Sequence, residues 1–370
     1  MNFDPNKSLA DGIRIIENAV IVPFGAGKRG GIRRPAAIYD AGGNYVPLGQ
    51  CFRSWGRPVT VEPDSPPTDD QIEPTLPGTW LFGGMIYTHF GHFLVETTSR
   101  LWALDHLDTP PDGVIFMPRK QAAKPERFIS PVLPLLDMFG KDVRNVRAVV
   151  RPKRVERLIL APQGFGTGDM MGGSPEFRAY IARHLGDGIE PQGGEKLYIS
   201  RSRLFSKRGR YLGEKRLEQL FEAEGYEVFH PQDHTLAEQI ARYKAASKIV
   251  SSDSSALHLA AFFTRPDDRI AIILRRPGKI SRDFVTQFRH FANLQPVIAN
   301  ALNGRIYRAD NERKQMNEVF AELDFPSLGT KLAETGFITD PSAWTGPTEA
   351  ELEAERNDLS ERLGLPLVLG

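Results

Sequence analysis

The apolar positions of residues 197–262 follow two alternating spacings. Short runs rich in Tyr, Ile and Val, such as LYIS from Leu197 and KIVSS from Lys248, predict buried strands. Between them, RLEQLFEAEG and TLAEQIARYKAA carry apolar residues at helical spacing, and SSALHLAAFF begins a further helix. This order is typical of βαβ units that form a parallel sheet, in which ligands bind at the carboxyl ends of the strands.

The same patterns extend the α/β prediction along the chain. Residues 13–52 are β-rich with a Gly-containing turn at 40–44, and residues 56–79 are so dense in Pro and Asp that they predict a loop. Residues 81–107 are apolar at helical spacing. Further strands are expected at VIFMP, VRAVV, RLILAP, RIAIILRR and VIANALNGRIYRA, and further helices at PVLPLLDMFG, residues 175–185, DFVTQFRHFANL and most of the chain beyond 310.

The length of the chain predicts more than one domain. At 370 residues it exceeds the size at which a single core usually stops growing. Gly-rich polar segments that begin at residues 164 and 186 are the candidate boundaries. We therefore predict an α/β domain with a β-rich lead-in at 1–185, a ligand-binding α/β domain at 190–310, and a helical segment at 311–370 that packs back on the core.

Composition narrows the class of protein. The 47 Lys and Arg residues against 46 Asp and Glu leave a formal net charge of +1, so no overall field attracts nucleic acid and any basic site is local. The single cysteine, Cys51, cannot form an intrachain disulfide, which fits a reducing compartment. The N-terminal residues lack the apolar core of a signal peptide, and no window approaches the roughly 18 apolar residues of a membrane span. We expect a cytoplasmic protein, with association to the inner face of a membrane left open.

A group of ionisable residues begins at His89 and continues with His92, Glu96 and Arg100. If the segment is helical, these side chains lie near one stripe of the helix. His92 and Glu96 are four residues apart, so the carboxylate can orient the imidazole as a general base. Two alternatives stay open: His92 caps a helix while Glu96 pairs with Arg100, or the two histidines and Glu96 bind one metal ion.

Two further groups follow predicted strands. The first is a basic loop that contains Arg201, Arg203, Lys207, Arg208 and Arg210. Guanidinium groups there suit a pyrophosphate, with Arg201 nearest the strand end, although a solvated basic loop is the alternative. The second is a polar turn before an apolar helix, made of Asp253, Ser254 and Ser255. Free N–H groups at this helix start suit a phosphate; the alternative is an ordinary turn with a buried, hydrogen-bonded His258.

Four segments, in this order, resemble bacterial members of glycosyltransferase family 61, often labelled capsular polysaccharide biosynthesis proteins. They are FGHFLVETTSRLWAL, KLYISRSR, the unit at 217–231 that ends GYEVFHP, and TLAEQIARYKAASKIVSSDSSALHLAAF. The resemblance covers roughly residues 80–265. It implies a GT-B-like architecture of two Rossmann-like domains that face each other across a cleft. The acceptor would lie on the side of residues 1–185, and residues 190–310 would bind a nucleotide-sugar donor.

The resemblance also implies roles for individual residues. His92 and Glu96 correspond to the His and Glu of a family segment in which His89 replaces an Asn, and Arg201 corresponds to the Arg of the family's ISR segment. A Gly-rich turn of the family is replaced here by Asp253, Ser254 and Ser255. The donor-binding candidates are thus Arg201, Arg203, Lys207, Arg210, Asp253, Ser254, Ser255 and His258, and the acceptor or cleft candidates are His89 and Arg100.

The resemblance implies an inverting glycosyltransferase that needs neither a metal nor a cofactor. His92, oriented by Glu96, would remove the proton of an acceptor hydroxyl, while Arg201 and its basic neighbours would neutralise the departing diphosphate. The partners would be a nucleotide sugar and a glycan or glycolipid acceptor in surface polysaccharide biosynthesis, with pairing of two chains through the helix from Glu349 left open.

Two other classes stay open. A non-catalytic sugar-nucleotide-binding or polysaccharide-assembly protein is suggested by His89 and by the replaced glycines. A different cleft enzyme, such as an epimerase or a phosphate-ester hydrolase, is the other. No GxGxxG fingerprint follows an early predicted strand, which argues against a nicotinamide-dependent enzyme.

Overall fold

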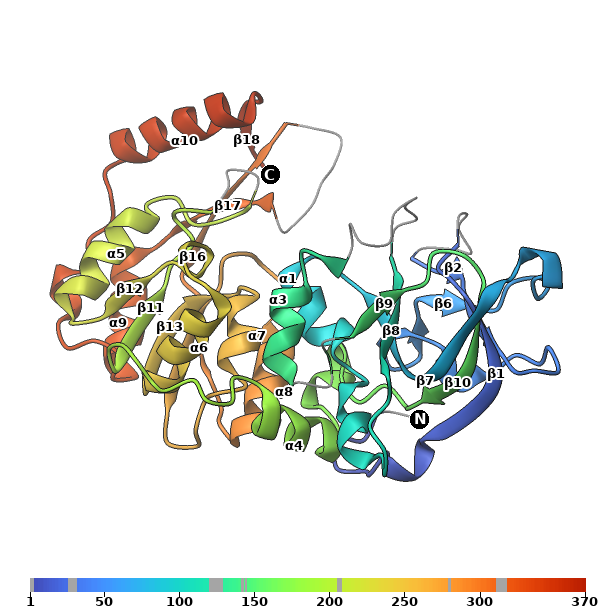
Figure 1. Ribbon diagram of the computed structural model, residues 1–370. Helices are drawn as coiled ribbons and strands as arrows, with labels where there is room; N and C mark the ends of the chain where they lie inside the picture. The colour runs from blue at the N-terminus through green and yellow to red at the C-terminus, as the bar shows by residue number, and fades with distance from the viewer. Residues whose placement is uncertain are drawn as a thin grey trace. The chain divides into compact units, whose positions relative to one another are not determined.

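The computed structural model describes residues 3–25, 32–119, 129–140, 143, 145–204, 208–278, 281–310 and 318–370. Over these residues the chain is a mixed α/β protein, as its apolar patterns predict (Figure 1). Its contacts divide it into two compact units, Met1–Gly188 and Ile189–Gly370, which we call unit 1 and unit 2.

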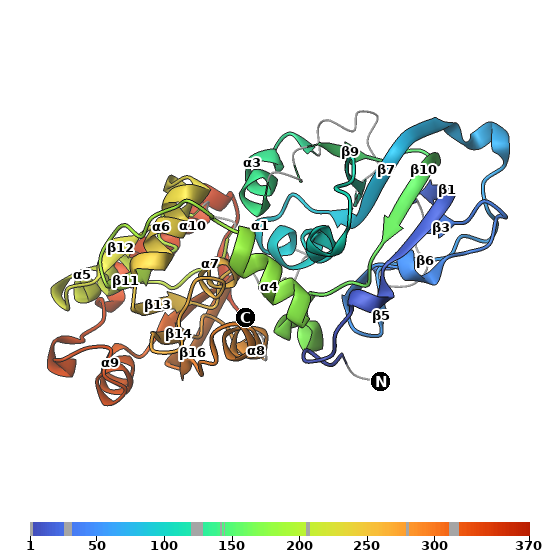
Figure 2. The same ribbon diagram turned by 60° about the horizontal axis from the view of Figure 1, so that its bottom comes forward.

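Unit 1 is built around a six-stranded sheet of order β3-β1-β10-β7-β8-β9. The strands are β1 (Arg14–Val22), β3 (Ala37–Tyr39), β7 (Glu73–Ile86), β8 (Gly113–Pro118), β9 (Val146–Ala148) and β10 (Lys153–Leu160). β10, β7, β8 and β9 run parallel, whereas β1 pairs antiparallel with β10 and β3; β7, β10 and β1 lie side by side in Figures 1 and 2. Two short pairs stand apart: β2 (Arg34–Pro35) with β6 (Thr60–Val61), and β4 (Phe52–Ser54) with β5 (Arg57–Pro58).

The turn predicted at residues 40–44 is confirmed. The N–H of Asp40 donates to the carbonyl of Asn44 at 2.9 Å, and the Asp40 carboxylate accepts from the N–H groups of Gly42 and Asn44 at 2.9 Å each. This Asx-type bonding closes the hairpin and brings Tyr39 opposite Tyr45.

The loop predicted at 56–79 is wrong at both ends, because β5 and β6 lie in its first part and β7 already begins at Glu73. Pro74 and Pro77 suggested a loop, since proline cannot donate a ladder hydrogen bond. The register between β7 and β10 shifts in this stretch, and β7 pairs with β8 only from Trp80 onward. The two prolines therefore lie where the strand is paired on one side and irregular, which is where a sheet tolerates them.

The helix predicted at 81–107 is wrong as far as Ile86, because β7 continues to that residue. The strand lies inside the sheet with both faces covered, so its residues from Trp80 to Ile86 are all buried and show no alternation of apolar and polar positions. Three short helical pieces follow: α1 (Phe90–His92), a π-helical turn (Phe93–Thr97) and a 3₁₀ segment (Leu101–His106).

The remaining helices of unit 1 are shorter than the sequence predicts. α3 (Leu133–Leu136) runs into a 3₁₀ turn (Asp137–Phe139), and α4 spans Pro175–His184. Ser174 caps α4 by accepting from the N–H of Phe177 at 3.2 Å, and a proline occupies the first helical position. Further 3₁₀ turns lie at Ala10–Gly12, Pro47–Gly49, Asp69–Gln71 and Gly168–Gly172.

Unit 2 contains the parallel sheet that the βαβ pattern predicts. Its order is β12-β11-β13-β14-β15, and all five strands run parallel. The strands are β11 (Lys196–Ile199), β12 (Glu227–Phe229), β13 (Lys248–Ser252), β14 (Arg269–Ile273) and β15 (Val297–Ala299). They alternate with α5 (Glu214–Ala223), α6 (Leu236–Ala245), α7 (Ala256–Ala260) and α8 (Ser281–Ala292), with a 3₁₀ turn at Pro231–Asp233.

The C-terminal part of unit 2 differs from the prediction. β16 (Leu302–Ala309), expected as a closing strand, instead pairs antiparallel with β17 (Phe320–Leu323) and β18 (Leu367–Leu369) in a separate sheet. α9 (Phe325–Glu334), a 3₁₀ turn (Pro341–Ala343) and α10 (Glu349–Leu363) complete the chain. α5 and α9 share one core with the five-stranded sheet through Leu217, Phe221 and Leu328, and α6 lies on the opposite side of that sheet from α9 (Figures 1 and 2).

Candidate functional site

His92 and Glu96 of unit 1 form the close pair that their spacing predicts. The Nδ1 atom of His92 contacts the Oε2 atom of Glu96. The Glu96 side chain is 5% exposed and the His92 side chain is 30% exposed, so the carboxylate lies beneath an imidazole that reaches the surface. When Nδ1 carries the proton and donates to the carboxylate, Nε2 of the neutral ring is the acceptor. The pair therefore provides a proton acceptor on a partly exposed ring.

Two aromatic rings hold the His92 imidazole in place. The ring of Tyr87 stacks on it with centroids 5.4 Å apart and an interplanar angle of 25°, and the ring of His89 meets it edge-on at 5.2 Å. Burial, together with the negative charge of Glu96, raises the pKa of the Tyr87 phenol. Tyr87 thus stays a neutral platform at physiological pH. The sequence analysis missed this residue, because an isolated aromatic at a strand end carries no chemical signal.

The backbone around the pair departs from a regular α-helix. His89 is the residue before α1 and is extended, with φ −81° and ψ 122°, so it is not on a helical stripe with the others. The N–H of Phe93 donates to the carbonyl of His89 at 2.8 Å, and the N–H of Tyr87 donates to the hydroxyl of Thr97 at 3.0 Å. The π-helical turn between them keeps Glu96 within reach of His92. Such turns occur often at functional sites.

Arg100 lies in the interior of unit 1 with 1% exposure. Its guanidinium donates to the carbonyls of Gln50 at 2.7 Å and Ala161 at 3.0 Å. Gly84, with φ +93°, makes room for it, because a Cβ there would lie 2.7 Å from an Arg100 Nη atom. These contacts connect three separate segments of unit 1 and give Arg100 a role in the fold.

Arg201 of unit 2 lies two residues after Ile199, the last residue of β11. Its Nε and one Nη donate to the carbonyl of Gly209 at 3.1 and 3.0 Å, and its backbone N–H donates to Glu214 at 2.7 Å. Burial, and then the positive charge of Arg275, lower its pKa to about 10. A side chain at position 209 would collide with the carbonyl of Val319, so a glycine there lets the loop approach closely enough to hold Arg201.

Asp253 is the centre of a charged group at the same edge of the sheet. The carboxylate is buried and lies 3.3 Å from Nε of Arg275 and 2.9 Å from Nε of Arg276. It also accepts from the backbone N–H of Arg275 at 3.2 Å. Both arginines were missed as site candidates, although the pair of arginines at the end of the predicted strand RIAIIL was a signal that could have been used. The charge of Asp253 is thus engaged by residues that follow β14.

Glu214 is a second residue that the sequence analysis missed. It opens α5 with 1% exposure, and its Oε1 accepts from the N–H of Arg201 and, at 3.4 Å, from the hydroxyl of Ser200. Burial raises its pKa to about 7, against the opposing effect of the Arg201 hydrogen bond and charge. No sequence signal distinguishes this residue from the other glutamates near helix starts.

The turn after β13 places Ser254 and Ser255 before α7, which has only five residues. Ser255 is the N-cap residue but makes no side-chain capping bond. The Ser254 hydroxyl is buried and finds no hydrogen-bond partner among the residues described. His258 lies in α7, where Nδ1 is 2.8 Å from Oε1 of Gln287 and the ring packs 4.7 Å from that of Phe284. This hydrogen bond is the one expected if the turn after β13 is an ordinary turn and His258 has a structural role.

The basic loop is divided between exposed and buried positions. Arg203 is 64% exposed and pairs with Asp233 at 3.1 Å, as a solvated side chain does. Arg210 is 8% exposed and donates to the carbonyl of Ser202 at 2.9 Å. Lys207 lies outside the described residues.

The structure therefore groups the candidates by unit. At the edge of the unit 2 sheet, electrostatic interactions connect five charged side chains, namely Arg201, Arg210, Asp253, Arg275 and Glu214. The other candidates, His89, His92, Glu96 and Arg100, belong to unit 1. Within the described ranges, no three His, Cys, Asp or Glu side chains are placed to hold a metal ion. Among the same residues, no helix is long and apolar enough to cross a membrane.

Comparison with known proteins gives a match to a family model. The model of the family Glycosyltransferase 61 matches residues 90–271. That span begins at α1, includes His92, Glu96 and Arg201, and ends within β14. No curated protein matches the chain. The match over residues 90–271 supports the assignment of this chain to glycosyltransferase family 61.

Proposed function

We propose that the chain is an inverting glycosyltransferase that moves a sugar from a nucleotide-sugar donor to a hydroxyl of a glycan or glycolipid acceptor, in surface polysaccharide biosynthesis. The family assignment supports glycosyltransferase activity. The observation that carries the proposal further is the His92–Glu96 pair, in which a buried carboxylate orients a solvent-accessible imidazole. This arrangement is that of a general base with its orienting group.

In the proposed reaction His92 acts on the acceptor. Its Nε2 takes the proton of the acceptor hydroxyl as that oxygen forms a bond to C1 of the donor sugar. The bond between C1 and the diphosphate oxygen breaks, and its electron pair leaves with the nucleoside diphosphate. Glu96 stabilises the imidazolium that forms, since its carboxylate contacts the Nδ1 side of the ring. Attack from the face opposite the leaving group inverts the configuration at C1.

Unit 2 supplies the donor side of the proposal. Arg201, Arg275 and Arg276 place guanidinium groups at the carboxyl ends of β11 and β14, where ligands bind in parallel sheets. Guanidinium groups hold phosphates through paired hydrogen bonds and neutralise the charge of a departing diphosphate. In this proposal they perform the neutralisation without a metal ion or a cofactor.

We further propose a GT-B arrangement, in which unit 1 takes the acceptor and unit 2 the donor. The support is that each unit has its own sheet and core, with the candidate base in one unit and the candidate phosphate ligands in the other. We place the enzyme in the cytoplasm, where nucleotide sugars are supplied, and at the inner membrane face if the acceptor is lipid-linked.

Substitution of His92 tests the proposal. His92→Ala should lower kcat about 100- to 10,000-fold, the usual contribution of a general base, and leave nucleoside diphosphate affinity unchanged by calorimetry. His106→Ala, which removes an exposed histidine of the same unit, is the matched control. Transfer that continues at the wild-type rate in His92→Ala would remove His92 from the base role.

A non-catalytic sugar-nucleotide-binding or assembly protein is the second candidate. It is favoured by the engagement of Arg201 with Gly209 and of Asp253 with two arginines, which leaves fewer of these groups for a reacting substrate. Donor hydrolysis or transfer by the purified chain excludes this candidate; nucleotide-sugar binding with neither reaction across a panel of acceptors supports it.

A further inference from the structure

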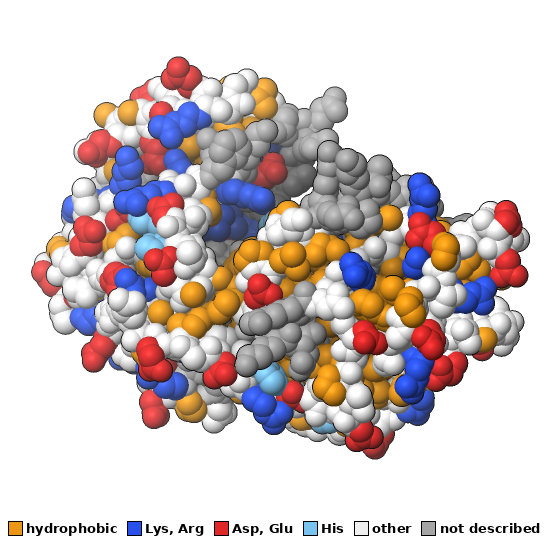
Figure 3. Space-filling view, viewed as in Figure 1, with side chains coloured by type: hydrophobic (Ala, Val, Ile, Leu, Met, Phe, Trp, Pro, Cys, Tyr) orange, Lys and Arg blue, Asp and Glu red, His pale blue; other side chains and the backbone are white. Residues whose placement is uncertain are grey.

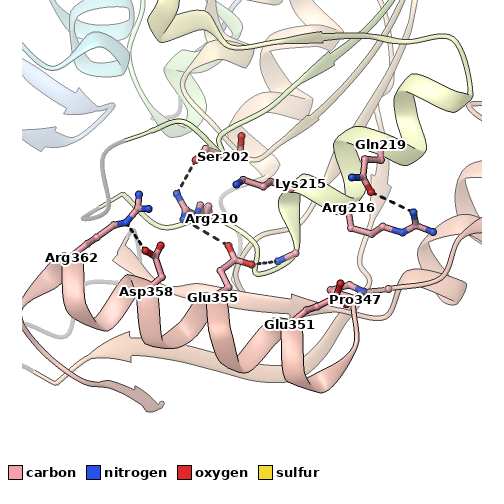
Figure 4. A pocket seen from close by; sticks show the side chains of 12 residues that line it. Ser202, Arg210, Lys215, Arg216, Gln219, Pro347, Glu351, Glu355, Asp358 and Arg362 are labelled. Atoms are coloured by element: carbon pink, nitrogen blue, oxygen red, sulfur yellow. Dashed lines mark hydrogen bonds and ion pairs between the residues drawn. The ribbon is translucent and has the colours of Figure 1, made fainter.

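Unit 2 contains a cavity of about 570 Å³ between the beginning of α5 and α10, and the arginine beside it is engaged within the unit (Figure 4). The Arg210 guanidinium donates to the carbonyl of Ser202 at 2.9 Å and pairs with Glu355 at 3.7 Å. Glu355 also accepts from the N–H of Gly213 at 2.7 Å. Figure 3 shows basic and acidic side chains interspersed over the surface around these two helices. Arg210 is therefore compensated within unit 2 and is not left for a ligand.

Arg119 of unit 1 differs from Arg210 in this respect. Its side chain is exposed and has no hydrogen-bond acceptor and no carboxylate partner among the residues described. Its Cζ atom lies over the ring of Tyr87, 5.5 Å from the ring centroid. Such a cation–π contact holds the guanidinium group against the face of a ring and uses none of its N–H donors. The contact therefore places a cation with unused donors beside Tyr87.

The sheet of unit 1 determines the position of Arg119. β7 ends at Ile86 and β8 at Pro118, the two strands run parallel, and these last residues pair with each other. Tyr87 and Arg119 are the residues that follow the two strands directly. Ligands of open α/β sheets bind at the carboxyl ends of the strands. The register thus brings the aromatic ring and the guanidinium group to an edge at which such sheets bind ligands.

The same Tyr87 ring stacks on the imidazole of His92, the candidate base. The centroids of these two rings are 5.4 Å apart. Arg119 Cζ and the centroid of the His92 ring are therefore no farther apart than the sum of 5.5 and 5.4 Å, since both distances start from the Tyr87 ring. Both groups are open to solvent, because Arg119 is exposed and the His92 side chain is 30% exposed. One short saccharide is long enough to contact both.

The electrostatics of this edge favour an anion. Burial and the negative charge of Glu96 raise the pKa of the Tyr87 phenol, against the opposing effect of the Arg119 charge. The ring therefore stays neutral and does not compensate the guanidinium group. The Glu96 side chain is 5% exposed and contacts Nδ1 of His92, so its charge acts mainly on the imidazole. The positive charge of Arg119 is thus left for a ligand at the surface.

We propose that Arg119 selects an acceptor that carries an anionic group, a carboxylate or a phosphate, near the hydroxyl group that His92 deprotonates. The guanidinium group would hold the anion through paired hydrogen bonds, while the hydroxyl group lies at Nε2 of His92. Arg119 is then a specificity-determining residue of the acceptor side, and no proton passes through it. The inference rests on the proposed function, because it takes His92 as the base.

Protection of His92 from carbethoxylation by diethyl pyrocarbonate measures this binding without a transfer assay. The rate of reaction at His92 is followed by mass spectrometry on the full-length protein, with the exposed His106 as internal control. The probes are D-galacturonate, D-galactose 6-phosphate and neutral D-galactose, which share one ring and differ at C6, and sodium chloride keeps the ionic strength constant. At ten times Kd of an anionic probe, the rate at His92 should fall about 11-fold while that at His106 stays constant.

The probes identify the anionic group. Protection by galacturonate alone identifies a carboxylate, protection by galactose 6-phosphate alone identifies a phosphate, and protection by both shows that the negative charge is the shared determinant. No protection by either anion up to about 50 mM, where even a Kd of about 5 mM gives the 11-fold effect, would overturn the proposal. Equal protection by galactose, or an equal fall in the rate at His106, would overturn it as well.

A matched pair of variants assigns the protection to one side chain. Arg119→Gln should lose it, whereas Arg147→Gln should keep it. Arg147 is the control because it is also exposed and its Cζ lies over an aromatic ring of the same sheet, 5.9 Å from the centroid of Trp80. Protection that persists in Arg119→Gln would contradict the proposal. A changed rate without any probe, together with unchanged protection, would show that Arg119 only supports the Tyr87 ring.

Transfer kinetics separate this role of Arg119 from the proposed reaction itself. Arg119→Gln should raise KM for an anionic acceptor about 10- to 100-fold, the effect of one charged hydrogen bond, and change kcat far less than His92→Ala does. Transfer with an unchanged KM in Arg119→Gln would refute the role of Arg119 and leave the glycosyltransferase. Protection that depends on Arg119 in a protein that transfers no sugar would leave the anion site and refute the reaction.

Discussion

Replacement of Glu214 by Gln should make the unfolding free energy of unit 2 less sensitive to rising pH. The carboxyl group of Glu214 is buried, and its pKa is raised to about 7 from the ordinary value of 4.5, chiefly by burial. Its Oε1 accepts from the N–H of Arg201 at 2.7 Å, whereas Oε2 has no hydrogen-bond partner among the described residues. Gln has the same shape and retains the acceptor, but it cannot ionise.

The sign of the effect follows from the direction of this pKa change. A carboxyl group whose pKa is higher in the folded state binds its proton more tightly there, so it supports folding fully at pH below 4.5. This support is lost as the pH rises from 4.5 through about 7, where the folded protein must ionise a buried group. The difference between about 7 and 4.5, at about 1.4 kcal/mol per pH unit, corresponds to about 3 kcal/mol. Between pH 4 and pH 8, wild type should therefore lose about 3 kcal/mol more unfolding free energy than Glu214→Gln.

Urea unfolding at the two pH values measures this difference. Because the chain has two units, the transition of unit 2 is followed by pulse hydrogen exchange at one fixed pH, using peptides from β11 and α5. Glu222→Gln, an exposed position of the same helix, is the matched control and should follow wild type. A Glu214→Gln variant whose difference from wild type is the same at pH 4 and pH 8 would refute the reasoning. The reasoning would also be refuted if Glu214→Gln lost more unfolding free energy than wild type between pH 4 and pH 8.

Two further substitutions test the charged edge of unit 2. Arg201→Ala should weaken the affinity for a nucleoside diphosphate about 10- to 100-fold by calorimetry, since a charged hydrogen bond contributes about 1.5–3 kcal/mol, while Arg203→Ala at an exposed position should have a smaller effect; unchanged affinity in Arg201→Ala would exclude it from phosphate binding. Asp253→Asn should destabilise unit 2 by about 3–5 kcal/mol in urea, because it leaves Arg275 and Arg276 without their shared counter-charge. Asp358→Asn, a half-exposed surface pair, is its control, and a loss in Asp253→Asn no larger than in that control would count against the buried network.

The parallel sheet of unit 2 could be predicted because its local patterns agree with its packing. β11 and β13 are short apolar runs, and α5 and α6 carry apolar residues on one face between polar turns. The His92–Glu96 contact could be predicted for the same kind of reason, since a spacing of four residues brings side chains together in α- and π-helical turns alike.

What the sequence could not predict depends on contacts between distant segments. Glu73 and the two prolines after it form a strand only because β10 pairs along one side of them. The raised pKa of Glu214 depends on burial that the rest of unit 2 supplies, and the interior position of Arg100 depends on the carbonyls of Gln50 and Ala161. Spacing along the chain contains no information on such burial, which is why Arg100 looked like a member of the His92 stripe.

The charges at the edge of the unit 2 sheet balance only while Glu214 is ionised. The charged groups linked there are Arg201, Arg210, Arg275 and Arg276, together with Glu214, Glu218, Asp253 and Glu355, which pairs with Arg210 at 3.7 Å. Four positive charges then face four negative charges, and an excess of one positive charge appears when Glu214 holds its proton, which its pKa of about 7 allows near neutral pH. Partly buried excess charge is unfavourable unless it is paired. A diphosphate supplies the missing negative charge, so the arrangement that weakens the isolated fold is the one that favours the leaving group of the proposed reaction.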